Sequence, residues 1–316
     1  MKKTIKLTSL VLAMVIFVLS VFACTAVPPE EPDTIPQPSS DPINITLSHN
    51  SISADKESGL TIAETTVTIK APGTYKFTGA LDDGNIIIDI LVDGNVFLVL
   101  AGVDITCSDF APIYCKQVNN LYICLEKDTT NKVTDGSNYV LAEGEDEPDA
   151  AIFSHDDLFV MGEGSLIVDA NYNDGITGKD DVNIESGNIT INAANHGIKG
   201  KDSLEIKGGK IEITANGDGL KSTQDKDATL GFVEIKAGDI IITAGDEGIQ
   251  AFTNILIKGG NIKIDSVDSA MKAEQVIDLR DGKIDINTYN SPFSASKIEN
   301  ASAVSVNVNG EKFEFN

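Results

Sequence analysis

The sequence has no tryptophan, only 6% aromatic residues and three histidines among its 316 residues. Its six tyrosines are scattered, so no strip of exposed rings is visible on which a flat crystalline glycan could stack. Basic residues are also scarce, since 24 lysines and arginines stand against 48 acidic residues and leave a formal net charge of −24. So acidic a surface repels phosphate groups, and we therefore expect neither nucleic acid nor anionic lipid as a partner.

Cysteine is rare as well, with four in the chain, and its spacing matches no zinc-binding pattern. Cys107 and Cys115 flank an apparent turn, Ser-Asp-Phe-Ala-Pro, so a disulfide between them is conceivable in an oxidising location. The alternative, which we favour, is that these two and Cys124 are small apolar residues in the wall of a core.

The stretch from Leu158 to about Tyr289 lacks the i, i+3, i+4 spacing of an amphipathic helix and instead repeats itself about every 22 residues. The repeat is plain when VNIESGNITINAANHGIKGKD (182–202) is set beside LEIKGGKIEITANGDGLKST (204–223). The first apolar position of each unit falls at Leu158, Val182, Leu204, Val233, Ile255 and Ile277. A fixed period of this length predicts a stacked array rather than an ordinary globular core.

Two runs in each unit alternate between β-branched and polar residues, as in Ile189-Thr190-Ile191, which is typical of half-buried strands. Leucine-rich and armadillo repeats are disfavoured because they need a helix in every unit. Three short strands per unit, joined by glycine or small polar corners, predict an all-β fold. The expected architecture is a right-handed parallel β-helix of roughly 9–10 coils of ~22 residues with capped ends.

Stacking of the coils predicts two columns of inward-facing residues. The first column contains Val160, Ile184, Ile206, Ile235, Ile257 and Leu279. The second contains Val168, Ile191, Ile213, Ile242, Ile264 and Ile286. In the "DGI"-like corners between them, the glycines at 175, 197, 219 and 248 are expected to supply a tight corner or a positive φ.

The repeat is blurred but present before Leu158, so we expect one β-helix domain over residues 43–316. Its end coils would expose unpaired strand edges and must be covered. Alternating valines at 304, 306 and 308, then Asn309-Gly310, Phe313 and Phe315, predict a hairpin lid at the C-terminal end. The strand-like residues 43–70 are expected to cover the other end.

The first residues read as a targeting segment. Lys2, Lys3 and Lys6 precede an uninterrupted apolar run, which indicates a lipoprotein-type signal peptide over residues 1–23. Val21-Phe22-Ala23-Cys24 resembles a bacterial lipobox, so Cys24 is the expected site of lipidation. Ordinary cleavage after Ala26 and a retained membrane anchor are the alternatives.

Residues 24–42 are rich in proline, serine and acid, which predicts an extended tether. No later segment is apolar enough to span a bilayer. We therefore expect a secreted bacterial protein held at the cell surface through its lipid anchor, with release into the medium as the alternative.

Several sequence segments in a fixed order carry a family resemblance. PGTYKFTGALDDGNIIID, LVLAGVDIT, AAIFSHDDLFVMGEGSL, DGITGKDDVNI and NGDGLKS together resemble the secreted bacterial carbohydrate-binding domain-containing proteins, which are similar in fold to pectate-lyase-like polysaccharide lyases. The resemblance runs from roughly Pro72 to Lys283. It implies a calcium-containing right-handed β-helix that binds plant or envelope polysaccharide, and it does not by itself imply catalysis.

Two columns of acidic residues are candidate cation sites, because Ca²⁺ accepts hard oxygen ligands and would relieve repulsion between stacked carboxylates. The first column contains Asp156, Asp180 and Asp202, with Asp181 beside it. The second lies at the "DGI" corner and contains Asp174, His196, Asp218 and Glu247, with Asp246 and Asp268 beside it. The alternative is that these residues cap turn amides and are otherwise solvated.

Cations stand in two further columns. Lys199, Lys221 and Lys272 lie beside the corner ladder and could contact sugar carboxylates or simply neutralise the ladder. An outward column could do the same or could pair with Glu205, Glu234 and Asp278. That outward column contains Lys207, Lys236, Lys258 and Arg280.

An enzyme hypothesis rests on Lys221, Lys199 and His196, which could supply the base of a β-elimination. Nearby carboxylates would raise the pKa of a lysine, which argues against it as a base. An insertion around residues 222–227 lengthens one repeat beside Asp218 and Lys221, and such insertions often lie on the binding face of a solenoid.

The sequence therefore predicts an extracellular, surface-anchored protein that binds acidic or plant cell-wall polysaccharide with the help of Ca²⁺ and acts as a monomer without catalysis. A calcium-dependent pectate-type polysaccharide lyase is the first alternative. A structural surface protein or adhesin with a protein partner is the second.

Overall fold

The computed structural model describes residues 35–315, in which every regular element is a β-strand and no helix occurs. The predicted signal peptide, Cys24 and most of the tether lie outside the described residues. Residues Pro38–Asn316 form one compact unit. In the described part of the chain, no helical segment has the length and apolar character that a membrane crossing requires.

The strands form two large sheets, and each coil supplies two strands to one sheet and one to the other. Strands β15 (Asp181–Ile184) and β16 (Asn188–Ala193) belong to the 21-stranded sheet, and β17 (Ile198–Gly200) belongs to the 11-stranded sheet. Each strand pairs in parallel with the equivalent strand of the next coil, as β16 does with β19 (Lys210–Ala215). The predicted three strands per repeat are therefore present.

The remaining strands follow the same scheme, except that the end strands β2, β3 and β32 pair antiparallel. In the larger sheet they are β1 (Ile43–His49), β2 (Ser51–Ala54), β5 (Gly73–Leu81), β7 (Asn95–Cys107), β9 (Asn120–Leu125), β10 (Thr130–Asp135), β12 (Asp157–Gly162), β13 (Ser165–Ala170), β18 (Ser203–Ile206), β21 (Phe232–Ile235), β22 (Asp239–Ala244), β24 (Asn254–Ile257), β25 (Asn261–Ser266), β27 (Val276–Leu279), β28 (Lys283–Thr288), β30 (Lys297–Asn300), β31 (Ser305–Val308) and β32 (Glu311–Lys312). In the smaller sheet they are β3 (Leu60–Ala63), β4 (Thr66–Ile69), β6 (Asn85–Asp89), β8 (Ile113–Gln117), β11 (Ala150–Ser154), β14 (Asp174–Gly178), β20 (Leu220–Ser222), β23 (Ile249–Ala251), β26 (Met271–Ala273) and β29 (Phe293–Ser294).

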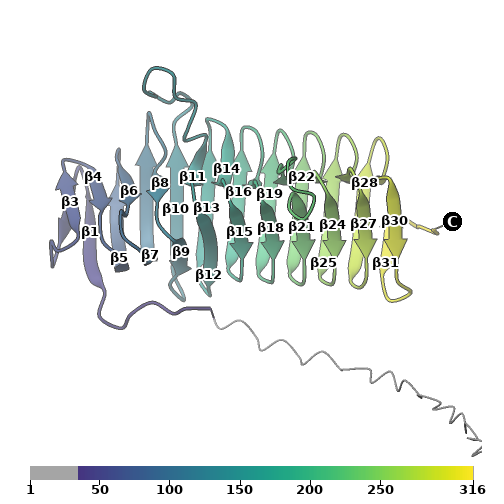
Figure 1. Ribbon diagram of the computed structural model, residues 1–316, viewed down its shortest axis with the longest axis horizontal. Coiled ribbons are helices and arrows are strands. Elements are labelled where there is room, and N and C mark those ends of the chain that lie inside the picture. The colour runs from purple at the N-terminus through teal and green to yellow at the C-terminus, as the bar shows by residue number, and fades with distance from the viewer. Residues whose placement is uncertain (1–34, 316) are drawn as a thin grey trace, which may run out of the picture. The chain divides into compact units, whose positions relative to one another are not determined.

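Both predicted inward columns are confirmed by the strand register. Val160 pairs with Ile184, which pairs with Ile206, and the series continues to Leu279. The second column runs in the same way from Val168 to Ile286. Figure 1 shows the strands as successive rungs from β3 and β1 at the purple end to β30 and β31 at the yellow end.

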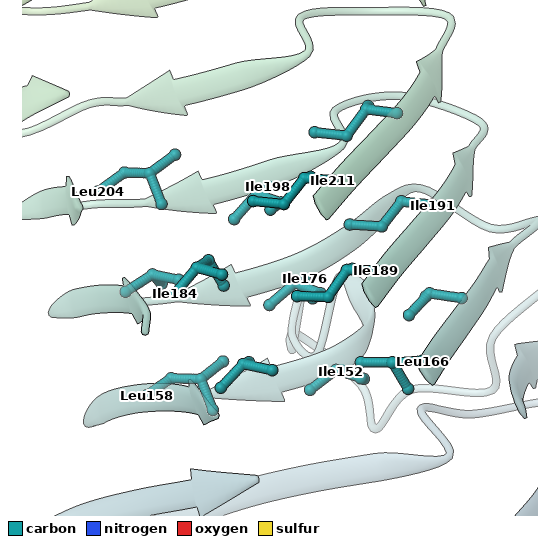
Figure 2. Packing of buried hydrophobic residues seen from close by; sticks show 14 of the residues in the cluster. Ile152, Leu158, Leu166, Ile176, Ile184, Ile189, Ile191, Ile198, Leu204 and Ile211 are labelled. Atoms are coloured by element: carbon teal, nitrogen blue, oxygen red, sulfur yellow. The ribbon is translucent and has the colours of Figure 1, made fainter. Parts of the chain in front are cut away.

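The core is the interior of this stack. Figure 2 shows Ile184, Ile189, Ile191 and Ile198 pointing from their strands toward a common interior, and all four are fully buried. Each such side chain contributes about 1.5–3 kcal/mol of burial free energy. Neighbouring strands stand about 4.8 Å apart and are paired in register, so equivalent side chains of successive coils are in direct contact.

The corner glycines are needed for space rather than for backbone conformation. Gly197 and its equivalents at 175, 219 and 248 do not have a positive φ, so that part of the expectation was wrong. A Cβ on Gly197 would lie 2.5 Å from the carbonyl oxygen of Gly219 and 2.5 Å from Cγ2 of Ile213. The coil turns so sharply here that its backbone contacts the next coil directly.

We expect Gly197→Ala to lower the free energy of unfolding by roughly 1–3 kcal/mol, as overpacking in a rigid interior does. Gly208→Ala is the matched control, because that glycine also lacks a positive φ and its Cβ would meet only one atom, at 3.3 Å. Urea-induced unfolding of both variants measures the difference. Equal midpoints for the two variants would contradict the crowding at the corner.

Hairpins cover both ends of the stack, as expected. At the N-terminal end β1 pairs antiparallel with β2, and β3 pairs antiparallel with β4. At the C-terminal end β31 pairs antiparallel with β32 through the predicted turn. Phe313 and Phe315 then pack on Phe293 of the last small-sheet strand, with ring centroids 5.5 and 5.8 Å away.

Cys107, Cys115 and Cys124 are all buried free thiols, which confirms the reading as wall residues. Burial raises the pKa of Cys107 to about 11 and that of Cys115 and Cys124 to about 12.

We therefore expect these thiols to react with Ellman's reagent at mildly alkaline pH about 100-fold more slowly in the folded protein than in urea, since only the thiolate is nucleophilic. The measurement uses a Cys24→Ser variant, so that the three buried thiols are the only ones present. Rapid reaction of the folded protein would show that one of them is accessible.

Candidate functional site

The outward side of the smaller sheet carries the predicted lysine column. Thr177, Lys199, Lys221, Gln250 and Lys272 are paired in this order through successive strands. On each short strand the residue before faces the core, as Ile198 does, so the following lysine points outward. Alternation along a strand thus converts a sequence repeat into a line of ammonium groups.

The corner ladder lies beside these lysines and is deeply buried. Asp174 and Asp218 are fully buried and Glu247 is 1% exposed. The backbone N–H of His196 donates to Asp174 Oδ1 at 3.1 Å. In the next coils the N–H of Asp218 donates to His196 Nδ1 at 3.0 Å, and the N–H of Glu247 donates to Asp218 Oδ1 at 3.0 Å. The side chains of Asp174, His196 and Asp218 thus each cap the equivalent amide of the following coil.

The lysines neutralise the ladder. Lys199 Nζ contacts both Asp174 and Asp149, and Lys221 Nζ lies 2.7 Å from Asp218 Oδ2. Lys272 pairs with Glu247 in the same way. Burial lowers the pKa of Lys199, but the charges of Asp174 and Asp149 outweigh this and leave its pKa above the ordinary value. Lys199 is therefore an ammonium ion at neutral pH and a poor base.

His196 is an acceptor within the ladder. Burial is the main reason that the pKa of His196 falls to about 4, with Lys221 and Lys199 adding to it against the charge of Asp174. The ring is therefore neutral at neutral pH. Its Nδ1 accepts the Asp218 amide, so the single ring proton is on Nε2. With one nitrogen engaged and the other protonated, this imidazole has no free lone pair for proton abstraction.

One group of ladder carboxylates is close enough to share an ion. Oxygen atoms of Asp218, Asp246 and Glu247 all lie within 4.8 Å of one another. The pKa of the exposed Asp246 is raised by partial burial and by the charges of Glu247 and Asp268, so negative charge here is incompletely balanced. Asp268 lies on the next coil, and Asn290 of the coil after that donates a hydrogen bond to it.

The other predicted acidic column is in register but is engaged in turn contacts. The backbone N–H of Val118 donates to Asp156 Oδ2 at 2.8 Å, and Gln224 of the inserted segment donates to Asp202 Oδ1 at 2.8 Å. Ser203 donates to Asp181 at 2.7 Å. The pKa of Asp180 is raised by burial and by Asp202 and Asp156. Among residues 35–315 this column does not form a group comparable with that of Asp218.

The outward cations of the larger sheet are paired with acidic neighbours. Lys207 lies 2.7 Å from Glu185, and Lys236 lies 2.8 Å from Glu205. Lys258 contacts Glu234, and Arg280 lies 2.6 Å from Asp278 and 3.4 Å from Glu299. These contacts follow the alternative in which the cations balance the charge of the sheet.

The inserted segment after β20 packs on the first acidic column, because the N–H of Gly231 donates to the carbonyl of Asp202. Beside its start is a small hollow of about 160 Å³, lined by Thr223, Gln250, Phe252, Lys272 and Glu274 among others. The insertion thus lies next to the lysine column, as the repeat lengths suggested.

A cluster of aromatic residues was missed by sequence reasoning. Phe110, Tyr114 and Phe153 come together on the outward side of β8 and β11, and Tyr139 and Tyr172 join them. The available signal was the equivalence of Ile113 and Ile152, which places Tyr114 directly beside Phe153. The loop that brings Tyr139 has no counterpart in the repeat.

These features define an all-β protein of stacked parallel rungs with a charged outward face. A solved structure with this architecture is the polysaccharide lyase-like protein from C. thermocellum in its gadolinium derivative, which is 31% identical with a TM-score of 0.70 over 84% of this chain and 99% of that one. The family model for carbohydrate-binding domain-containing proteins matches residues 63–316, and the chain belongs to this family.

A curated relative, the carbohydrate-binding domain-containing protein of Acetivibrio thermocellus, is 39% identical over 150 residues. The match covers 47% of this chain and 52% of that relative, so the chain spans about half of the relative's length.

Proposed function

We propose that this protein is an extracellular polysaccharide-binding protein without catalytic activity, built as a right-handed parallel β-helix. The observation that carries the proposal is the family match over residues 63–316, which includes every rung of the lysine column and the corner ladder. The paired state of those lysines supports binding over catalysis. Acidic or plant cell-wall glycans are the proposed ligands.

The proposed cation is Ca²⁺, held by Asp218, Asp246 and Glu247. The donor set fits, because it offers only carboxylate oxygens, and Asp246 is open to solvent. Lys221 and Lys272 already balance Asp218 and Glu247, so the unbalanced charge is centred on Asp246. When bound, the ion would bridge the acidic protein to the carboxylates of a glycan.

We expect Ca²⁺ to raise the melting temperature of the protein and a chelator to reverse the change, because a ligand at 100 times its Kd stabilises the folded state by about 2.7 kcal/mol. Asp246→Asn should abolish the shift. Asp225→Asn, which alters an exposed carboxylate of the inserted loop, should retain it. An unchanged calcium response in Asp246→Asn would remove the proposed site.

Glycan binding is tested by pull-down on insoluble polysaccharides and by an array that includes polygalacturonate, with Ca²⁺ and with chelator. We expect retention on at least one glycan, with calcium dependence for the acidic ones. Failure to bind any glycan under either condition would overturn the proposal and favour a structural surface protein with a protein partner.

A calcium-dependent polysaccharide lyase is the second candidate, favoured by the likeness to a polysaccharide lyase-like structure. Its catalytic set would be Lys221, Lys199 and His196. The protonated Lys199 and the occupied His196 ring argue against this role. Incubation with polygalacturonate distinguishes the two functions, since sustained, calcium-dependent absorbance from unsaturated product would establish the lyase.

We also propose that the mature protein is a monomer, tethered to the cell surface through lipid on Cys24. Metabolic labelling with a fatty-acid analogue tests the anchor: label should be present in the native protein and absent from Cys24→Ser. Label that persists in the variant would exclude this residue as the anchor.

A further inference from the structure

A surface groove lies on the outward side of the smaller sheet, on the coils that precede the lysine column; Tyr114 and Phe153 are in register with Thr177 at the start of that column. It has a volume of about 370 Å³ and is lined by β6, β8 and the loop between β10 and β11. This volume is within the range of about 300–1,000 Å³ found for small-molecule sites. Its lining combines Phe110 and Tyr114 with Lys116, Glu145 and Glu147, and with the aliphatic Ile87 and Leu141.

Tyr114 is fixed in place by the surrounding rings. Phe110 and Phe153 meet it at interplanar angles of 69° and 63°, with centroids 5.4 and 5.8 Å away. Edge-to-face contacts of this kind are favourable and set the plane of a ring. The half-buried Tyr114 therefore offers a rigid aromatic surface in the lining of the groove.

The loop that completes the groove is also fixed. Tyr139 stacks on Tyr172 at a centroid distance of 4.0 Å and on Phe110 at 5.9 Å. Its hydroxyl lies 2.7 Å from the buried Asp135 carboxylate. Glu147 of the same loop pairs with Lys179, which directly follows β14. The loop after β10, which rises from the rungs in Figure 1, is thus anchored at both ends, and the groove exists before any ligand arrives.

The polar groups indicate which ligand fits. An aromatic face contacts the C–H groups of a sugar ring. Lys116 Nζ lies over the Tyr114 ring, 5.7 Å from its centroid, so a stacked sugar would move this flexible side chain aside, to the edge of the ring, where it can donate to sugar hydroxyls. Glu145 and Glu147 can accept from hydroxyls but repel a carboxylate. Lys179 balances Glu147, so Lys116 stands against Glu145 alone. A lining without net positive charge disfavours a uronic acid and favours an uncharged sugar.

We propose that this groove is a subsite for a neutral pyranose unit, with Tyr114 as the stacking platform and Lys116 and Glu145 as hydroxyl partners. The inference rests on the proposed glycan binding and names the sugar class that this groove takes. It places neutral-sugar recognition on the coils before Leu158, several rungs away from the carboxylates proposed to hold Ca²⁺. A polysaccharide with both neutral and acidic units could then contact both places.

The test measures binding of cellohexaose, xylohexaose and mannohexaose, with hexagalacturonate as the acidic comparison, by isothermal titration calorimetry. Every sugar is titrated once with chelator and once with Ca²⁺. Because the chain has no tryptophan, the tyrosine absorption difference spectrum reports stacking on a tyrosine directly. We expect at least one neutral oligosaccharide to bind and to perturb this spectrum. Tyr114→Ala should weaken binding about tenfold or more, and Tyr114→Phe should retain most of it.

Tyr289→Ala is the matched control, because Tyr289 is 87% exposed and lies near the other end of the stack. Circular dichroism melting of all variants distinguishes a loss of sugar affinity from unfolding. Equal affinities for wild type, Tyr114→Ala and Tyr289→Ala would overturn the subsite. Binding of hexagalacturonate with Ca²⁺, together with no binding of any neutral sugar, would overturn the subsite and leave the proposed function standing. No binding of any sugar in either condition would overturn both.

Discussion

Replacing Asp174 with alanine is expected to lower the free energy of unfolding by about 3–5 kcal/mol, the cost of breaking a buried ion pair from one side. Asp174 is fully buried. Its Oδ1 accepts from Asn195 Nδ2 at 3.0 Å and from the His196 N–H at 3.1 Å, while its Oδ2 contacts Lys199 and Thr177. Alanine leaves these donors without their acceptor inside the wall of the coil. Unfolding in urea, followed by circular dichroism, measures the loss.

A double-mutant cycle separates pairing from packing. Lys199→Met should cost less in the Asp174→Ala background than in the wild type, because the first substitution has already broken the pair; the coupling should be about 0.5–3 kcal/mol. Asp265→Ala is the control, since this exposed carboxylate makes one long contact, 3.3 Å from Asn287, and should change stability by no more than about 0.5 kcal/mol. Additive effects of the first two substitutions would contradict the ladder as a coupled network.

Removal of residues 305–316 is expected to make the protein, which we propose to be a monomer, aggregate. This deletion takes away β31, β32, Phe313 and Phe315, and so uncovers the parallel edge of β28 and the ring of Phe293. An open edge with an apolar interior behind it is a template for pairing with another chain. Size-exclusion chromatography with light scattering detects the change.

Removal of residues 1–37, which precede the compact unit, is the control for shortening the chain and should leave a monomer. A milder variant, Phe313→Ala with Phe315→Ala, keeps the β31–β32 hairpin and removes only its apolar cover. It should aggregate more slowly than the deletion. A deletion that remains monomeric would show that the lid does not protect the edge.

The repeat made much of this architecture predictable. Residues such as Ile184 and Ile206 have the same place in the period, and parallel pairing of identical units puts them opposite each other. The same logic brought Lys199 beside Lys221, and Asp174 into line with His196 and Asp218. The asparagine–glycine turn at the C-terminus was predictable because this residue pair favours the tight hairpin turn in which both residues have a positive φ.

Other features could not be read from the period. At the corner positions only glycine fits, because a Cβ would clash with a backbone carbonyl oxygen of the next coil. The distance between two coils cannot be predicted from the sequence of one repeat. Lys199 pairs not only with Asp174 of the ladder but also with Asp149, which precedes it by more than two units and is not related to it by the period. Phe110, Tyr139 and Tyr172 meet only because an irregular loop folds back onto the sheet.

The sequence by itself determined the stack of rungs, its interior and its lids. Alternation of apolar and polar residues sets which face of each strand is buried, and the fixed period sets which strands stack on one another. The tertiary structure decided which charges are already balanced, which carboxylates approach one another, and where aromatic rings gather. Those outcomes depend on side-chain reach across coils and on one loop outside the repeat, and such contacts join residues that no local pattern relates.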